Sequence, residues 1–223
     1  MCAQFMIRGS ARLIGEHFQA RMAPELTHRD YEDRVVPFKP GLVVVRREGH
    51  RELREMRFHL TPRWSKEERV KWATYNARLD SIETKATFKA AFRENHCLVI
   101  LNGFIEPIYK GDYAGYMVQF HRPDGLWMAA AGIFDQWVHP TTGEIVESFS
   151  IITDEPDEFV AKTGHDREPL FLRPDYFDEW LEPKKAKPED LKGELRSHRA
   201  NIELIADRDR AMRPGWEKRI PEE

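Results

Sequence analysis

The 223-residue sequence is poor in cysteine and has no long apolar run. Its two cysteines, Cys2 and Cys97, are too few for a disulfide framework and favour a reducing compartment. About 18 consecutive apolar residues occur nowhere, so we expect no transmembrane helix. The first residues also lack the apolar stretch of a signal peptide. These absences together favour a cytoplasmic protein.

The motifs of common metal and nucleotide sites are also missing. The nine histidines and two cysteines show neither CxxC nor HExxH spacing, so no metal site is expected. Neither GxxxxGK[ST] nor GxGxxG occurs, which excludes the usual phosphate-binding loops, and we expect no cofactor. A net charge of −3 argues against a uniformly basic DNA-coating protein, so any nucleic-acid surface has to be a local patch.

What the sequence does contain is many short apolar segments separated by turn residues. β-Branched and aromatic residues predict strands at residues 42–46, 55–60, 97–108, 113–121, 127–134, 147–153 and 170–172. The turn Arg122-Pro123-Asp124-Gly125 predicts a hairpin between the segments 113–121 and 127–134. Many strands with few helices between them indicate a single α+β domain built on antiparallel sheet.

Helical periodicity and capping residues predict short helices at residues 10–20, 65–75, 87–95, 156–162 and 174–181. From Pro183 onward the sequence is highly charged and has only sparse apolar positions. This composition is typical of one or two solvated helices lying on the domain, or of a tail. We therefore expect a domain at residues 1–182, followed by a charged C-terminal segment at residues 183–223.

Cys2 is the first residue that could carry chemistry, because it directly follows the initiator methionine. Methionine aminopeptidases remove Met1 when the next side chain is small, and cysteine qualifies. The new N-terminal residue would bear an α-amine and a thiol on adjacent carbons. These two groups can trap an aldehyde, first as a Schiff base and then as a five-membered thiazolidine. Alternatively, Cys2 is merely a tolerated N-terminal residue.

Three further segments are candidates. Asn76 and Arg78 follow a predicted helix and offer an amide and a phosphate-binding guanidinium, although a turn with a surface arginine has the same pattern. Glu106 ends an apolar strand, where a carboxylate suits proton transfer or simply faces solvent. His165 precedes another strand and can act as an acid or base near neutral pH, or be an ordinary loop histidine.

In their order along the chain, these segments resemble the SOS response-associated peptidase (SRAP) family of abasic-site-processing proteins. The resemblance extends from Met1 to about Leu181. It rests on Met1-Cys2, Pro40-Gly41, Pro62-Arg63-Trp64, Asn76-Ala77-Arg78, Cys97-Leu98 with Asn102-Gly103-Phe104-Ile105-Glu106, Ala131-Gly132-Ile133-Phe134-Asp135, Ile151-Ile152-Thr153 and His165-Asp166-Arg167-Glu168-Pro169. No block is specific alone, but their order and spacing together are.

The resemblance implies a single domain with a twisted, antiparallel, barrel-like β core, flanked by short helices. It also implies that the protein crosslinks to abasic sites in single-stranded DNA and shields the lesion. Cys2 would be the nucleophile that forms the thiazolidine, and Asn76 would hold the N-terminal residue. Glu106 would transfer the proton that opens the deoxyribose, with His165 as its partner in Schiff-base chemistry.

Further roles follow from the same resemblance. Arg78 would grip a phosphate, Trp64 would stack on a base beside the lesion, and Pro40 would contact DNA. Family members remove their own first residue or a short propeptide with the same groups, and the Schiff base could support a weak lyase activity. The expected partner is single-stranded DNA with abasic sites, bound by a monomer.

The sequence departs from the family at DNA-contacting positions. The usual Cys-Gly-Arg start is here Cys2-Ala3-Gln4, the aromatic residue after the glutamate is Pro107, and the C-terminal asparagine-rich strand is not recognisable. Two other functions therefore stay open. One is a single-stranded DNA-binding module that has lost the chemistry, and the other is a cysteine peptidase that acts on other proteins.

Overall fold

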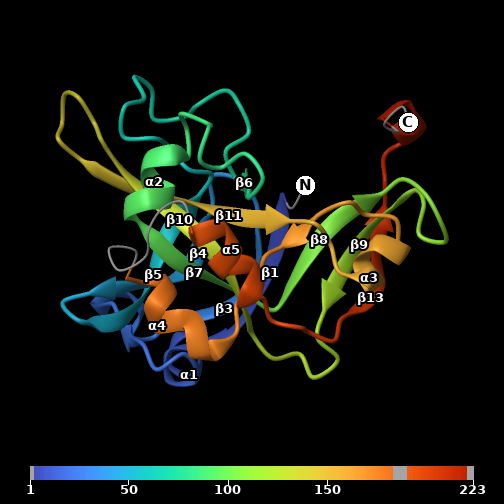
Figure 1. The fold of residues 1–223 in the computed structure, drawn as a ribbon, viewed down its shortest axis with the longest axis horizontal. Helices are drawn as coiled ribbons and strands as arrows, with labels where there is room; N and C mark the ends of the chain where they lie inside the picture. Colours follow the sequence, from blue (N-terminus) through green and yellow to red (C-terminus); the bar gives the residue numbers. More distant parts are fainter. Residues whose placement is uncertain (1–2, 183–189, 220–223) are drawn as a thin grey trace.

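The computed structural model describes residues 3–182 and 190–219, and a ring of five strands forms its core (Figure 1). These strands are β4 (Pro40–Arg47), β5 (His50–Phe58), β7 (His96–Leu101), β10 (Met128–Val138) and β11 (Ile145–Asp154). They pair in the order β11-β10-β7-β4-β5, and β5 returns to β11 in parallel, which closes the barrel. The predicted α+β domain with a barrel-like core is confirmed.

The barrel strands β7 and β4 contain apolar runs, because both of their faces are covered. Every residue of β7 is buried, as are residues 41–45 of β4. Such continuous hydrophobic runs are typical of core strands, whereas a half-exposed strand would alternate apolar and polar residues. The helices α2 (Lys89–Glu94) and α4 (Phe177–Trp180) cover one side of the barrel, where the Trp180 indole stacks on the His96 ring with their centroids 3.6 Å apart.

A second sheet of five strands has the order β13-β9-β8-β1-β3. Its members are β1 (Gln4–Ser10), β3 (Asp30–Val35), β8 (Gly103–Ile108), β9 (Tyr116–His121) and β13 (Ile205–Ala211). The chain passes from the barrel into this sheet between β7 and β8, at Asn102. The Asn102 side chain accepts from the Arg8 N–H at 2.7 Å and donates to the Gly125 carbonyl at 2.9 Å, which fixes the junction.

Short elements complete the domain. Three two- or three-residue strands add to the barrel sheet, namely β2 (Arg21–Met22), β6 (Asn76–Arg78) and β12 (Glu168–Pro169). The remaining helices are α1 (Ala11–His17), η1 (Pro24–Leu26), α3 (Glu158–Lys162), η2 (Pro174–Tyr176), α5 (Leu191–Ser197) and η4 (Trp216–Arg219). Among residues 3–182 and 190–219, no helix is long and apolar enough to cross a membrane.

The helix predicted at residues 65–75 is wrong, because this segment is a loop of turns and bends. Its periodicity is polar, and only Val70 and Thr74 within it are buried. A helix in a globular protein is stabilised chiefly by packing an apolar face, and this segment has none to pack. The other predicted helices within residues 1–182 are confirmed, with shorter boundaries.

The predicted hairpin between residues 113–121 and 127–134 is also wrong. The turn itself is present, since the Gly125 N–H donates to the Arg122 carbonyl at 3.1 Å. However, β9 pairs with β8 and β13 in one sheet, whereas β10 pairs with β7 and β11 in the barrel. The turn therefore connects the two sheets, and a local turn signal does not reveal which strands its two arms pair with.

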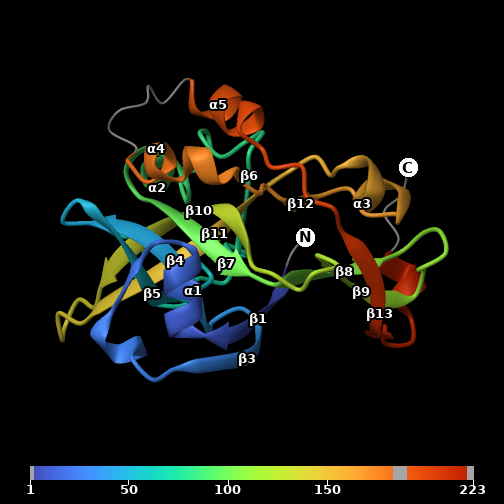
Figure 2. The same cartoon turned by 90° about the horizontal axis from the view of Figure 1, so that it is seen from below.

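The C-terminal segment contributes to both sheets of the molecule. Helix α5 buries Leu191 and Leu195, and Arg196 pairs with the buried Asp154 at the end of β11. Strand β13 pairs antiparallel with β9, although the sequence predicts only helices or a tail there. Figure 2 shows this strand at the edge of the second sheet.

Close packing of the barrel generates a stability prediction at Gly132 of β10. A Cβ atom there would lie 2.6 Å from Val99 Cγ2 and 2.8 Å from Cys97 Sγ. We expect Gly132→Ala to lower the free energy of unfolding by about 1–3 kcal/mol through overpacking. The control is Gly193→Ala in α5, which meets no atom within 4 Å and should raise stability by about 0.5–1 kcal/mol. Urea unfolding of both variants checks this, and equal effects would contradict it.

Candidate active site

A buried carboxylate and a buried imidazole meet where β8 passes the loop after α3. Glu106 of β8 is 0% exposed, and its Oε2 lies 3.3 Å from Nε2 of His165, whose side chain is 6% exposed. Two such groups in contact can pass a proton between them and onward to a third group. Sequence positions nearly sixty residues apart are thus brought together as a pair that can do acid–base chemistry.

The backbone around His165 fixes the direction of its ring. Gly164 has φ +97°, and a Cβ there would lie 2.6 Å from the Lys110 carbonyl oxygen, so only glycine fits. His165 Nδ1 lies 2.8 Å from the Arg167 carbonyl oxygen, the shorter of its two contacts with Arg167, and we assign it a proton that it donates there. The other nitrogen, Nε2, is then directed to Glu106 and can accept or return a proton.

Asn76 is a buried amide without hydrogen bonds to the rest of the described chain. It begins β6, opposite Ile151 of the parallel strand β11, and is 7% exposed. Within residues 3–182 and 190–219, neither Oδ1 nor Nδ2 has a hydrogen-bond partner. An unpaired buried amide costs stability, which makes the Asn76 side chain a candidate for binding a ligand.

Arg78, two residues further along β6, is half-exposed and lies in a small ion-pair network. Its Nη2 lies 3.5 Å from Asp80 Oδ2, and Nη2 of Arg167 lies 3.3 Å from the same oxygen. Asp80 thereby joins the strand of Asn76 to the loop of His165. The exposed guanidinium of Arg78 can reach a phosphate without leaving this position.

A groove of about 590 Å³ lies beside these residues. The residues that line it include Ala3, Tyr75, Ile105 and Pro107. Tyr75 precedes Asn76, the other two strand residues flank Glu106, and Ala3 is bonded to Cys2, which itself lies outside the described residues. The groove therefore lies next to three predicted catalytic positions in the chain, and the alternation of side chains along β8 directs Glu106 to the face opposite Ile105 and Pro107.

Trp64 lies on the loop between β5 and β6, where it stacks with Trp72, a residue outside the predicted site. Trp64 and Trp72 are 53% and 47% exposed, and their rings lie 6.3 Å apart at 15°. Their indole N–H groups donate to the Ala86 carbonyl and to Thr87 Oγ1, both at 3.3 Å. Trp72 lies only four residues before Asn76, and this closeness to a candidate site residue is the signal that could have identified it.

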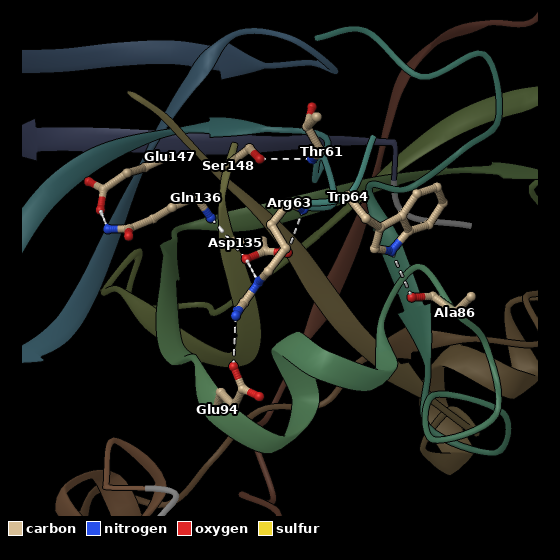
Figure 3. Close-up of polar contacts among 9 residues, drawn as sticks. All are labelled: Thr61, Arg63, Trp64, Ala86, Glu94, Asp135, Gln136, Glu147 and Ser148. Atoms are coloured by element: carbon tan, nitrogen blue, oxygen red, sulfur yellow. Dashed lines mark hydrogen bonds and ion pairs between the residues drawn. The ribbon is translucent and has the colours of Figure 1, made fainter. Parts of the chain in front are cut away.

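The barrel holds this loop in place at its base, as Figure 3 shows. The Arg63 backbone N–H and Nε both donate to the buried Asp135 carboxylate at 2.8 Å, and Arg63 Nη1 reaches Glu94 at 2.9 Å. The Thr61 N–H donates to Ser148 Oγ at 2.8 Å. These bonds leave the tryptophans facing solvent on an otherwise fixed support.

None of the predicted site residues that the structure describes lines the groove itself; Asn76, Arg78, Glu106 and His165 lie behind or beside its wall. Pro40 is exposed at the start of β4, opposite Arg57, and Trp64 is on the loop described above. Neither is among the described residues that line the groove. Cys97 is fully buried, and burial raises the pKa of its thiol, as expected for a core cysteine. Among the described residues no group of three or more His, Cys, Asp or Glu side chains could hold a metal ion.

Comparison with known proteins gives consistent results. The family model for SOS response associated peptidases (SRAP) matches residues 1–207. Abasic site processing protein YoaM of Bacillus subtilis is 29% identical over 161 residues, covering 72% of this chain and 70% of that protein. YoqW of the same organism, also named an abasic site processing protein, is 26% identical over 203 residues, covering 90% and 89%. A crystal structure of a Bacteroides thetaiotaomicron protein has the same fold, with a TM-score of 0.77, 22% identity, and coverage of 97% and 94%.

The state of Asn76 generates a prediction that separates a ligand-binding amide from a structural one. Asn76→Ala should leave the free energy of unfolding within about 0.5 kcal/mol of wild type or raise it, because it removes an unpaired buried amide. Asn102→Ala, at an equally buried asparagine with two side-chain hydrogen bonds, should lower it by about 1–3 kcal/mol. Chemical denaturation of both variants measures the difference. A loss at Asn76 as large as that at Asn102 would indicate a structural role.

Proposed function

The chain belongs to the SOS response associated peptidase family, and from this premise we propose that it processes abasic sites in single-stranded DNA by a covalent bond through Cys2. Its relatives YoaM and YoqW are named abasic site processing proteins. The observation that carries the proposal is the buried Glu106–His165 pair. The residues on either side of Glu106 line the same groove as Ala3, the residue bonded to Cys2.

The proposed reaction begins once Met1 has been removed. The α-amine of Cys2 adds to the aldehyde of the ring-opened abasic sugar and forms a Schiff base with loss of water. The thiol then adds across the C=N bond, so that sulfur bonds to carbon and the thiol proton passes to nitrogen. This closes a thiazolidine without any change of oxidation state. Fixed amine and thiol groups favour the reaction because they raise the effective concentration of both reactants.

The side chains near the groove assist these steps. Glu106 transfers the proton that opens the deoxyribose ring, and His165 returns it during Schiff-base formation. Asn76 holds the N-terminal residue with its amide. β-Elimination from the Schiff base is a weak side reaction, which thiazolidine closure suppresses. Removal of the first residue by the same groups prepares the enzyme for DNA.

Exposed side chains outside the groove support binding of a single strand by a monomer. Arg78 offers a half-exposed guanidinium to a phosphate. Trp64 offers an exposed ring face, on which a base of any identity can stack. Pro40 adds an apolar contact at the start of β4. Together these groups hold the strand while the aldehyde reacts.

The proposal predicts that the adduct depends on Cys2 and not on Cys97. Wild-type protein mixed with single-stranded DNA containing one abasic site should form a species that survives denaturing electrophoresis and has the summed mass of protein lacking Met1 and DNA, less water. Cys2→Ala should form none. Cys97→Ala, which removes a buried thiol remote from solvent, should form the adduct at the wild-type level.

Other outcomes would favour the alternative functions. DNA binding by wild-type protein lacking Met1, with no adduct, would indicate a binding module that has lost the chemistry. Turnover of an unstructured protein in a Cys2-dependent manner would indicate a peptidase with other substrates. An adduct formed by Cys2→Ala would overturn the proposed nucleophile.

A second prediction concerns the rate of adduct formation. In protein shown by intact mass to lack Met1, Glu106→Gln should slow adduct formation by about 10²- to 10⁴-fold, because it removes a proton-transfer group and leaves the amine and thiol intact. Glu168→Gln is the matched control, since Glu168 is also a buried carboxylate but pairs with Arg199. It should retain the wild-type rate. Time courses under single-turnover conditions check this, and equal rates for wild type and Glu106→Gln would contradict the proposed role.

A further inference from the structure

The C-terminal segment supplies more than half of the residues that line the groove. Its residues on the groove wall are Arg210, Ala211, Met212, Arg213, Pro214, Gly215, Trp216 and Arg219. The residues that line the groove include three arginines and no acidic side chain. This is a local positive surface in a chain with a net charge of −3, as the sequence requires of any nucleic-acid-binding surface.

Specific contacts hold this wall against the second sheet. Strand β13 pairs with β9 along its length, and the Met212 N–H, just after it, donates to the Gly115 carbonyl at 2.7 Å. Trp216 packs directly on Gly115, where φ is +84° and a Cβ would lie 3.1 Å from Trp216 Cζ2. A side chain at that position would displace the indole. The wall is therefore a fixed part of the fold.

The three arginines differ in their contacts. Arg210 donates to Gln4 Oε1 at 3.1 Å and to Asp209 at 3.0 Å, so its guanidinium is oriented beside the start of β1. Arg213 and Arg219 are exposed, and neither makes an ion pair or hydrogen bond within the described part of the chain. Two unneutralised guanidinium groups on the rim of a groove favour a ligand with separate anionic groups, such as successive phosphates.

Aromatic side chains lie beside these charges. The rings of Tyr109 and Trp216 are 6.3 Å apart and tilted by 44°, and both residues line the groove. Trp216 is only partly buried. A positive groove combined with exposed aromatic faces is the usual binding surface for single-stranded nucleic acid, because arginines follow the backbone while bases stack on the rings.

We propose that residues 209–219, together with Tyr109, bind the phosphate and base of a nucleotide that flanks the abasic site on one side. This inference rests on the proposed function, because it takes the groove at Ala3 as the position of the lesion. Arg213 and Arg219 contact phosphates, and Trp216 stacks on the flanking base. The C-terminal segment is thus part of the DNA-binding surface.

Binding without covalent chemistry tests the phosphate contacts. The probe is single-stranded DNA with a tetrahydrofuran abasic analogue, which has no aldehyde, and fluorescence anisotropy measures its affinity at several salt concentrations. Each phosphate contact in a single strand contributes about 0.7 to the slope of log K against log salt. The double variant Arg213→Gln/Arg219→Gln should therefore lower the slope by about 1.4. The control Arg12→Gln/Arg21→Gln removes the same charge at two residues that do not line the groove, and it should leave the slope unchanged. Figure 2 shows α1, which carries Arg12, well away from β13.

A second variant tests stacking. Trp216→Ala should weaken binding by about 5- to 150-fold, which is the range for loss of one base–aromatic stack. Trp216→Phe keeps a ring face and should restore most of the affinity. Probes with flanking nucleotides on only the 5′ or only the 3′ side of the analogue identify the side, because the effect of Trp216→Ala should persist with one probe and vanish with the other.

The outcomes distinguish this inference from the proposed function. A wild-type adduct on aldehyde-containing DNA, together with groove variants that keep wild-type affinity and salt slope, would overturn the inference and leave the proposed function standing. Loss of affinity in the groove variants but not in the control supports the inference. Wild-type protein that neither binds nor crosslinks single-stranded DNA would overturn both. Unchanged thermal melting of the exposed arginine variants confirms that folding is not the cause.

Discussion

The pairing of one edge of β11 with two strands in succession determines where the candidate site forms. β5 runs parallel to the first part of that edge and closes the barrel, and β6 runs parallel to the next part. Because both strands lie on the same edge, the chain between Phe58 and Asn76 has to leave the sheet and return. The excursion becomes the loop that carries Trp64 and Trp72, and the returning strand places Asn76. By pairing with β5 and then with β6, β11 thus closes the barrel and fixes both the loop of Trp64 and Trp72 and the position of Asn76.

Local sequence signals predicted most of the barrel but not how its parts pair. The strand at residues 42–46 and the helix cap at Ser10 could be predicted, because burial and capping leave patterns within a few residues of sequence. The turn at Gly125 could also be predicted. However, the strands on its two sides belong to different sheets, and contacts distant in sequence decide which strands they pair with. Strand β13 was missed because most of its residues are exposed and charged. Such charge is typical of edge strands, which avoid pairing with other chains, and it hides the alternation that would reveal a strand.

The candidate site was predictable only in part for a similar reason. The resemblance supplied Glu106 and His165 as partners, and their contact at 3.3 Å agrees with that pairing. Composition and spacing alone could not bring them together, because they lie on different elements. Neither could they reveal that Asp80 joins Arg78 to Arg167, since surface ion pairs form between whichever charges the fold brings close. The groove could not be predicted, because part of its wall is formed by β13 and the residues that follow it.

An abasic site has no base of its own, so a protein that recognises it has to bind the nucleotides on either side. In both views the described chain begins, at the start of β1, between the loop that joins β5 to β6 and the C-terminal segment (Figures 1 and 2). The loop offers the stacked pair Trp64 and Trp72, and the C-terminal segment offers Trp216 with its arginines. Under the proposed function, aromatic faces therefore lie on both sides of the reacting position. Each stack restrains one neighbour of the lesion, and the flexible sugar between them is held where Cys2 can reach its aldehyde.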